Sequence, residues 1–381
     1  MQTPPVQVIS AGRVVTPSGD LTPGTVEVRH GRIAAVRRGS SGRADVAAPD
    51  GILAPGLIDL QVNGAAGADF LTCRRPADVD RARRYLASCG VTTFLPTLIT
   101  SPPAALAAAL DRWERWSRLS GGPRVGGLHL EGPYLNPQYR GAHPARYLRP
   151  PDRGQLAALL DRHPGLVRLV TLAPELPGAG ALIGLLRERG VAVAAGHTGA
   201  TYDQAREAFA AGVSLVTHLF NGMRAVHHRD PGIVVAALEH EEVAVSLIAD
   251  FVHVHPAVLR LAARLKGPRR TVLVTDAVAA AGLRGGRARL GSRRVRVTDV
   301  PRLADGTIAG SVLALDQAVR NMVALGFPLR DVIAMASSTP ARILGRPDLG
   351  RIAVGGIADL VLFDAGLRVR AVWVGGERIV G

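Results

Sequence analysis

Apolar runs of five to seven residues recur along most of the chain, and longer amphipathic segments separate them. Short continuous apolar runs indicate strands buried on both faces, whereas apolar residues spaced three and four apart indicate covering helices. The alternation of the two patterns predicts an α/β protein with a parallel sheet. The expected strands span residues 57–62, 91–97, 124–130, 167–172, 191–195, 213–217, 243–249 and 271–275.

Eight such units within about 300 residues match the size of a (β/α)8 TIM barrel. A doubly wound open sheet is the alternative, but no GxGxxG follows the first strand. Helices are expected within residues 104–119, 152–163, 202–212, 255–265 and 314–325.

The sequence pattern at both ends of the chain differs from that of the middle. The stretches "VQVISAGRVVTPSG" and "GTVEVRHGRIAAVRRG" near the start, and "RVRAVWVGGERIVG" at the end, indicate strands joined by glycine turns. We therefore expect residues 1–54 and 351–381 to form one small β-sandwich domain. The barrel, residues 55–350, would be inserted between its two halves.

The formal net charge of +15 first suggests a nucleic-acid partner. However, Lys266 is the only lysine, and the arginines are scattered through the helices rather than gathered in one stripe. Aromatic residues make up only 4% of the chain and leave few platforms for stacking bases. We expect no nucleic-acid partner, whereas a small anionic substrate is compatible with the charge.

The chain has two cysteines, Cys73 and Cys89, and no CxxC pair. This usage indicates reduced thiols in a cytosolic protein. The start, "MQTPPVQVIS", lacks the features of a signal peptide, and the longest uncharged run, residues 90–110, contains three prolines. We expect a cytoplasmic protein without a membrane span.

Polar residues stand where the expected strands end, and in a barrel these ends face one mouth. An isolated histidine or aspartate at such a place is more often a core residue or a helix cap. The ends carry Asp59, Gln61, Asn63, Glu131, His197, His218, Asn221, Asp250, His253 and Asp276.

Three of these residues form a chemically coherent set. Glu131, His197 and His218 lie at three different strand ends, and one carboxylate with two imidazoles suits zinc or a similar metal. Such a set leaves one position open for water, as catalytic metal sites do. Asp276, at the last strand, would be free to act on that water.

Longer motifs identify a family. The sequence resembles the N-acetylglucosamine-6-phosphate deacetylases of the amidohydrolase superfamily over nearly its whole length, from about residue 53 to 364. The motifs are "APGLIDLQVNG", "LHLEGPYLNPQYRGAH", "AGHTGATYDQA", "THLFNGM", "LVTDA", "GTIAGS" and "GGIADLVLFD".

The resemblance implies hydrolysis of an N-acetyl group on a phosphorylated amino sugar. Glu131, His197 and His218 would hold the metal, Asp276 would be the general acid and base, and His143 would polarise the acetyl carbonyl. The resemblance also implies a homodimer whose phosphate site is shared across the interface. The residues lining the sugar-phosphate site would be Ala142, His143, Asn221, Gly222, Arg229, His253 and Ile308.

One departure from other amidohydrolases bears on the number of metals. Many of them begin with HxH at the end of strand one, where this chain has Gln61 and Asn63. Amides are poor ligands for zinc-like metals, so we expect one divalent metal per chain, foremost zinc, with iron(II) as the alternative. Strand four ends in "TLAPE" without the lysine that bridges two metals in other members.

Several alternatives stay open. The substrate could be N-acetylgalactosamine 6-phosphate, because the motifs specify the chemistry better than the sugar. A barrel that binds an amino-sugar phosphate without turnover is a further alternative. Arg229 could contact phosphate, or it could form a surface ion pair with Asp230, and the roles of His227 and His228 are equally open.

Overall fold

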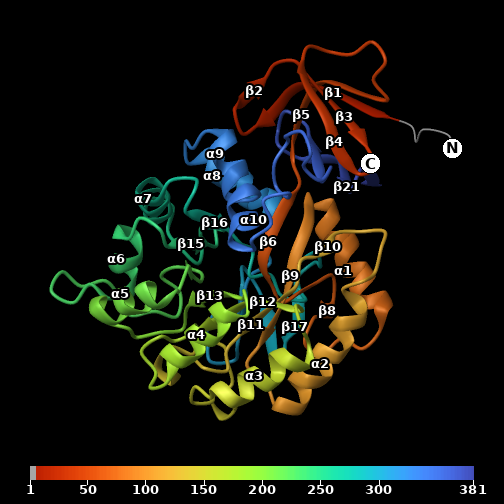
Figure 1. Cartoon of the computed structure of the whole chain (residues 1–381). Helices are drawn as coiled ribbons and strands as arrows, with labels where there is room; N and C mark the ends of the chain where they lie inside the picture. The colour runs from red at the N-terminus through yellow and green to blue at the C-terminus, as the bar shows by residue number, and fades with distance from the viewer. Residues whose placement is uncertain (1–5) are drawn as a thin grey trace.

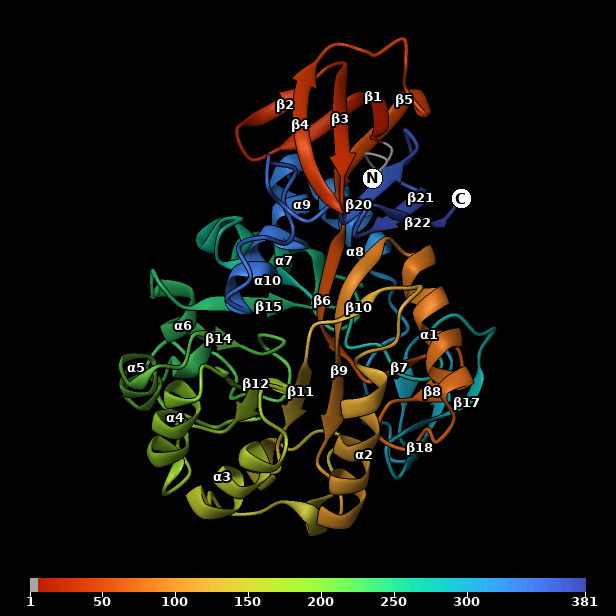
Figure 2. The same ribbon diagram turned by 45° about the vertical axis from the view of Figure 1, so that its right-hand side comes forward.

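Eight parallel strands in the middle of the chain form a barrel (Figures 1 and 2). The computed structural model describes residues 6–381. Each strand pairs with the next in the order given below, and a parallel bridge between Val62 and Ala277 joins the last strand end to the first. The strands are β6 (Leu57–Val62), β9 (Val91–Ile99), β11 (Leu128–Glu131), β12 (Val167–Leu172), β13 (Ala192–Ala195), β14 (Leu215–Val216), β15 (Ala244–Leu247) and β16 (Thr271–Leu273).

Helices follow the strands and cover the outside of the barrel. Their inward faces carry the apolar residues, such as Leu110 and Trp113 in the second helix and Leu182 and Leu186 in the fourth. They are α1 (Pro76–Ser88), α2 (Pro103–Trp116), α3 (Arg153–Arg162), α4 (Ala179–Glu188), α5 (Tyr202–Ala211), α6 (Gly232–Glu239), α7 (Pro256–Lys266), α8 (Leu315–Ala324), α9 (Leu329–Met335) and α10 (Ser338–Ile343).

The fold class expected from the sequence is confirmed, but individual strands differ from their expected ranges. The third strand is interrupted: β10 (Arg124–Val125) and β11 are separated by two glycines, and Gly127 has a φ of +120° that only glycine adopts easily. The sixth strand contains only Leu215 and Val216, because the chain beyond it turns into the loop that carries His218. Two 3₁₀ turns, η1 (Pro137–Tyr139) and η2 (Ala145–Tyr147), follow β11.

Strands from both ends of the chain share a second sheet, placed at the top of Figures 1 and 2. Its order is β22-β21-β20-β5-β1-β3-β4, with β2 paired to β1, so the expected β-sandwich is one continuous mixed sheet. Ile9, Leu53, Leu360 and Trp373 are fully buried in its separate apolar cluster. The strands are β1 (Gln7–Thr16), β2 (Gly19–Leu21), β3 (Gly24–Arg29), β4 (Arg32–Arg38), β5 (Val46–Pro55), β20 (Leu360–Phe363), β21 (Val369–Val374) and β22 (Glu377–Val380).

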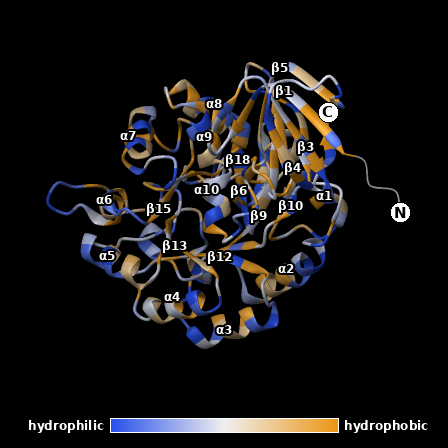
Figure 3. Cartoon of the chain, turned by 45° about the horizontal axis from the view of Figure 1, so that its top comes forward, coloured by the Kyte–Doolittle hydropathy of each residue, from blue (hydrophilic) through white to orange (hydrophobic). Residues whose placement is uncertain are grey.

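The domain boundaries given above stay a prediction, and residues 1–5 of the expected small domain lie outside the described residues. Figure 3 shows hydrophobic residues concentrated along the strands of this terminal sheet. No helix in the described part of the chain is both long and apolar enough to cross a membrane.

The loop after the eighth barrel strand contains a small sheet that the sequence analysis did not anticipate. Strands β17 (Gly286–Leu290), β18 (Arg293–Val297) and β19 (Pro301–Arg302) pair antiparallel. A two-stranded ribbon, β7 (Gly64–Ala65) and β8 (Ala68–Asp69), follows the first barrel strand. Figure 2 shows β17 and β18 beside β8 and α1.

Candidate active site

The carboxyl ends of four barrel strands bring Glu131, His197, His218 and Asp276 to one mouth. Glu131 is the last residue of β11, and the other three follow β13, β14 and β16 within three residues. His197, His218 and Asp276 have left-handed backbones, with φ values of 50°, 33° and 49°. Non-glycine residues seldom adopt this region, and such strain concentrates at functional sites.

Glu131 lies at the centre of the group and is only 3% exposed. Its Oε1 atom is 3.0 Å from His218 Nε2 and 3.2 Å from His197 Nε2, and it accepts a 3.1 Å hydrogen bond from Gln61 Nε2. Burial by itself would raise the pKa of Glu131, but the contacts with the two imidazoles hold it well below its usual range. Glu131 is therefore a buried carboxylate that stays ionised.

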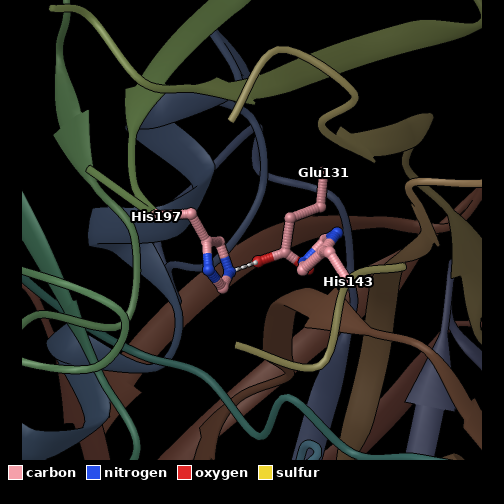
Figure 4. A group of neighbouring side chains, drawn as sticks. All are labelled: Glu131, His143 and His197. Carbon is pink, nitrogen blue, oxygen red and sulfur yellow. Dashed lines mark hydrogen bonds and ion pairs between the residues drawn. The ribbon is translucent and has the colours of Figure 1, made fainter. Parts of the chain in front are cut away.

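The contact between Glu131 and His197 requires an additional positive charge (Figure 4). His197 Nδ1 is 2.9 Å from the carbonyl oxygen of Tyr139, which can only accept, so Nδ1 carries the proton. A neutral His197 then turns a bare Nε2 atom toward the carboxylate, 3.2 Å away. Two acceptors repel each other at this distance unless a proton or a metal ion lies between them.

The donor atoms of Glu131, His197 and His218 form a compact triangle. The two imidazole Nε2 atoms are 3.2 Å apart, and each is within 3.2 Å of Glu131 Oε1. Ligands held tetrahedrally by zinc at about 2.0–2.1 Å are about 3.3–3.4 Å apart, so the triangle has the size that such an ion needs. The set of one carboxylate and two imidazoles fits a divalent metal.

A second grouping of possible ligands includes His143 instead of His218. Glu131, His143 and His197 each place one ligand atom within 4.8 Å of the others (Figure 4). His143 Nε2 is 3.7 Å from Oε2, the other oxygen of Glu131. The shorter and more equal distances favour the triangle with His218.

His143 is a buried, neutral imidazole next to this triangle. Burial lowers its pKa to about 3, and the neighbouring His197 adds to the effect. Its Nδ1 atom is 2.9 Å from Thr100 Oγ1, and its ring centre is 4.5 Å from that of His197. If Thr100 donates to Nδ1, then Nε2 of His143 carries a proton that can be donated into the mouth.

Asp276 faces the group from the last barrel strand. Its Oδ1 atom accepts hydrogen bonds from Asn63 Nδ2 at 2.6 Å and from Gln61 Nε2 at 3.2 Å. Gln61 thus donates to Asp276 and Glu131 at once. Burial raises the pKa of Asp276 to about 7, and the negative charge of Glu131 contributes. A carboxyl group with this pKa can both take and give a proton near neutral pH.

Gln61 and Asn63 present their amide NH2 groups to the mouth, because carboxylates can only accept hydrogen bonds. A metal ion would need the amide oxygens instead. That these two positions do not hold a second metal stays a prediction.

The residues assigned to the sugar phosphate, apart from Arg229, lie around the mouth at different depths. Ala142 is buried, whereas Asn221, Gly222 and Ile308 are half-buried. Gly222 has a φ of +61°, and a Cβ atom there would lie 2.8 Å from His197 Nδ1. His253 Nδ1 is 2.6 Å from Asp250 Oδ2, which fixes the orientation of its ring.

Arg229 does not pair with Asp230, which was one of the open alternatives. Asp230 instead forms an ion pair with Arg224, with a distance of 2.7 Å. Arg229 is exposed and contacts the neighbouring His228, with 2.8 Å between Nη1 and Nε2. Figures 1 and 3 show the segment between α5 and α6, which carries these residues, projecting from the molecule.

Sequence reasoning missed two groups that orient the site. Thr100 contacts His143, but the second strand extends to Ile99, two residues beyond its expected end, so the expected strand does not end next to Thr100. Tyr139 contributes a backbone carbonyl, for which the sequence carries no signal.

Comparison with known proteins agrees with this fold. Residues 52–379 match the model of the amidohydrolase family, and the chain belongs to that family. The motifs therefore indicated the family correctly.

Individual relatives narrow the comparison. The N-acetylgalactosamine-6-phosphate deacetylase of Escherichia coli O157:H7 is 39% identical over 374 residues, which cover 97% of this chain and 98% of that protein. The human N-acetylglucosamine-6-phosphate deacetylase is 38% identical, over 91% of this chain and 86% of that protein. A mutant N-acetyl-D-glucosamine-6-phosphate deacetylase from Mycobacterium smegmatis, solved with N-acetyl-D-glucosamine-6-phosphate, has a TM-score of 0.93 and 39% identity, over 99% and 100% of the two chains.

Proposed function

We propose that this chain is a metal-dependent amidohydrolase that removes the acetyl group from N-acetylglucosamine 6-phosphate, giving acetate and glucosamine 6-phosphate. The names of its relatives support this reaction. The observation that carries the proposal is the 3.2 Å contact between His197 Nε2 and the ionised Glu131, which needs a proton or a metal ion between the two atoms, with Asp276 across the mouth.

Glu131, His197 and His218 are the proposed ligands of one divalent metal per chain, foremost zinc, with iron(II) as the alternative. When bound, such an ion supplies a Lewis acid that lowers the pKa of water and polarises a carbonyl oxygen. Gln61 and Asn63 leave no ligands for a second ion.

Asp276 and His143 carry the proton chemistry. Asp276 takes a proton from the attacking water while the water oxygen forms a bond to the acetyl carbon. Nε2 of His143 donates a hydrogen bond to the carbonyl oxygen, on which negative charge develops. Asp276 then gives its proton to the sugar nitrogen as the carbon–nitrogen bond breaks, and acetate and the amine leave.

Ala142, Asn221, Gly222, His253 and Ile308 are the proposed lining of the sugar-phosphate site. Arg229 is the proposed phosphate contact, since its planar guanidinium suits phosphate oxygens. Because its segment projects away from its own barrel, we place it in the site of a partner copy. The protein would then be a homodimer with shared phosphate sites.

A cytoplasmic location is part of the proposal. Cys73 and Cys89 are both free thiols, as expected in a reducing compartment.

The test is acetate release from the 6-phosphates of N-acetylglucosamine and N-acetylgalactosamine and from unphosphorylated N-acetylglucosamine. We expect the first to react fastest. A preference for the galactosamine compound would establish the alternative that the Escherichia coli relative favours. Equal rates with and without phosphate would contradict the role of Arg229.

The Asp276→Asn variant separates an enzyme from a binding barrel. Asparagine keeps the size of the side chain but cannot take a proton, so turnover should fall by about a hundredfold or more. Elemental analysis should still find about one metal per chain, and two would contradict the single-metal proposal. Unchanged turnover would remove Asp276 from the mechanism, and absence of turnover in the parent protein would favour the binding barrel.

A further inference from the structure

The small sheet β17–β19 is attached directly to the catalytic strand end. Its first strand begins ten residues after Asp276. After its last strand the chain comes back to Asp276 at Ser311, whose amide donates a 2.8 Å hydrogen bond to the Asp276 carbonyl oxygen. Its β17–β18 turn is held by buried Asp69, which accepts a 2.6 Å hydrogen bond from the amide of Gly291. The hairpin is thus fixed at both ends beside the mouth.

One face of this hairpin consists of four arginines. Arg287 lies directly opposite Arg296, and Arg289 lies opposite Arg294. All four are exposed, and the residues alternating with them, such as Val295, face inward. We call these four residues the arginine tetrad. It corrects the expectation that the arginines are dispersed without forming a cluster.

The tetrad has no neutralising partner among the described residues. No ion pair or side-chain hydrogen bond is formed by its guanidinium groups there. The acids that line the adjacent cavity, which has a volume of about 1150 Å³, are Asp69 and Asp78. Asp69 is occupied by Thr72 and Gly291, and Asp78 by Arg75 and Arg81. Like charges directly opposite in a hairpin destabilise it, so this arrangement has a stability cost that its fold does not require.

We propose that the arginine tetrad is an electrostatic collecting surface for the phosphorylated substrate at the mouth of the barrel. This inference rests on the proposed function, because it takes a sugar phosphate as the ligand. Fixed positive charges beside a cleft raise the local concentration of an anionic substrate and its rate of capture, without touching the reacting atoms. A phosphate monoester carries close to two negative charges and responds strongly to such a field.

A nucleic acid is the other polyanion that such a face could attract. However, residues 284–302 contain no aromatic side chain on which a base could stack. The connection of this sheet to the Asp276 strand end through Ser311 also favours a ligand that enters the barrel.

The test compares two sets of four Arg→Gln substitutions with equal change in charge. The hairpin variant carries R287Q, R289Q, R294Q and R296Q. The control variant carries R29Q, R38Q, R43Q and R370Q, four exposed arginines on or beside the terminal sheet. At an ionic strength of about 0.01 M, the hairpin variant should lose about tenfold in kcat/KM for the sugar phosphate, and less than about twofold at 0.15 M. Its kcat should not change.

Three comparisons decide the result. The control variant should lose less than about twofold, and activity on the unphosphorylated sugar should be the same in all variants. A variant with four Arg→Lys substitutions in the tetrad should keep the kcat/KM of the parent protein, because electrostatic attraction of the substrate depends on the charge and not on the guanidinium geometry. Equal losses in the hairpin and control variants, or no loss in either, would overturn the proposal.

Two further measurements cover other outcomes. If the hairpin variant does not fold, the double variants R287Q/R296Q and R289Q/R294Q should each lose about threefold in kcat/KM at low ionic strength.

If the parent protein releases no acetate, the proposed function fails, and calorimetry with inorganic tripolyphosphate then tests the surface alone. Weaker binding by the hairpin variant than by the control variant would support the surface, and equal binding would overturn it. Duplex DNA binding that depends on the tetrad, with unchanged sugar-phosphate kinetics, would also overturn it.

Discussion

Two buried carboxylates, Asp359 and Glu131, are treated in opposite ways by the structure. Asp359, immediately before the terminal sheet's β20, accepts hydrogen bonds from Arg124 Nη1 at 2.5 Å and from the amide of Gly375 at 2.7 Å. Glu131 is equally buried but has imidazoles and one amide around it, and its contact with His197 Nε2 needs a proton or a metal ion between the two atoms. The first carboxylate is neutralised by the chain, and the second is left for a cation that the chain does not supply.

The comparison distinguishes a carboxylate that stabilises the fold from a carboxylate that serves the proposed site. The Asp359–Arg124 pair links the terminal sheet to the barrel and needs nothing further. The group around Glu131 is assembled from strained strand ends and is incomplete without a positive charge. Substitutions at the two places should therefore affect different properties.

The largest effect is expected for Glu131→Gln. Without the carboxylate, the proposed site loses its only anionic ligand, so acetate release should fall by at least about a thousandfold. Bound metal should drop well below one per chain in elemental analysis. Full metal content and activity would break the comparison.

The opposite pattern is expected for Asp359→Ala. Loss of the buried Asp359 leaves the half-buried Arg124 and the amide of Gly375 without their acceptor and should lower the free energy of unfolding by about 1–3 kcal/mol. Metal content and kcat of the folded protein should stay near the parent values. The control is Glu188→Ala, which removes an exposed ion pair with Arg153 and should change stability by about 0.5 kcal/mol or less. Urea unfolding measures both variants, and equal effects would contradict the assignment.

A third buried carboxylate, Asp59, extends the comparison, because its contribution to stability should depend on pH. Its partners are the Thr275 hydroxyl at 2.6 Å and two backbone amides, with no cation. Burial raises its pKa to about 7, and these hydrogen bonds lower it only in part. Because this value lies above that of the unfolded chain, the stability that Asp59 contributes is present below about pH 4 and is lost as the pH rises through about 7.

The Asp59→Asn variant should not show this loss. Asparagine cannot ionise, and Thr275 can accept from its amide while donating to the carbonyl oxygen of Gln61. Relative to the parent, the variant should therefore gain on the order of 2 kcal/mol in unfolding free energy between pH 4 and pH 7. Urea titrations across this range measure the difference, and parallel curves would show that Asp59 does not titrate there.

The smallest effect is expected for Gly222→Ala. A Cβ atom would lie 2.8 Å from His197 Nδ1 and 3.1 Å from the Tyr139 carbonyl oxygen, which would disturb the hydrogen bond that sets the His197 proton. Acetate release should fall by about tenfold. Gly190→Ala is the matched control, because Gly190 has a similar φ of +64° but no atom within 4 Å of the added carbon. Equal losses in both variants would mean that backbone strain alone is responsible.

Much of this architecture could be read from local patterns. An uninterrupted apolar run such as residues 191–195 indicates a strand buried on both faces, and eight strand-like segments alternating with amphipathic helices leave few folds open. Glu131, His197, His218 and Asp276 were identified because each breaks an apolar run with a charged or titratable group. The β17–β19 sheet escaped notice because its arginine-rich strands carry too few apolar residues to show a buried face.

The sequence by itself determined the barrel, the family and the residue types at the mouth, since these follow from periodicity and from motifs along the chain. Only the tertiary structure decided which nitrogen of His197 faces Glu131, that Gln61 joins two carboxylates, and that four arginines share one face of a hairpin. Such relations depend on distances between residues that are far apart in the chain. A proton position or a cross-strand pair has no counterpart in the linear order of residues.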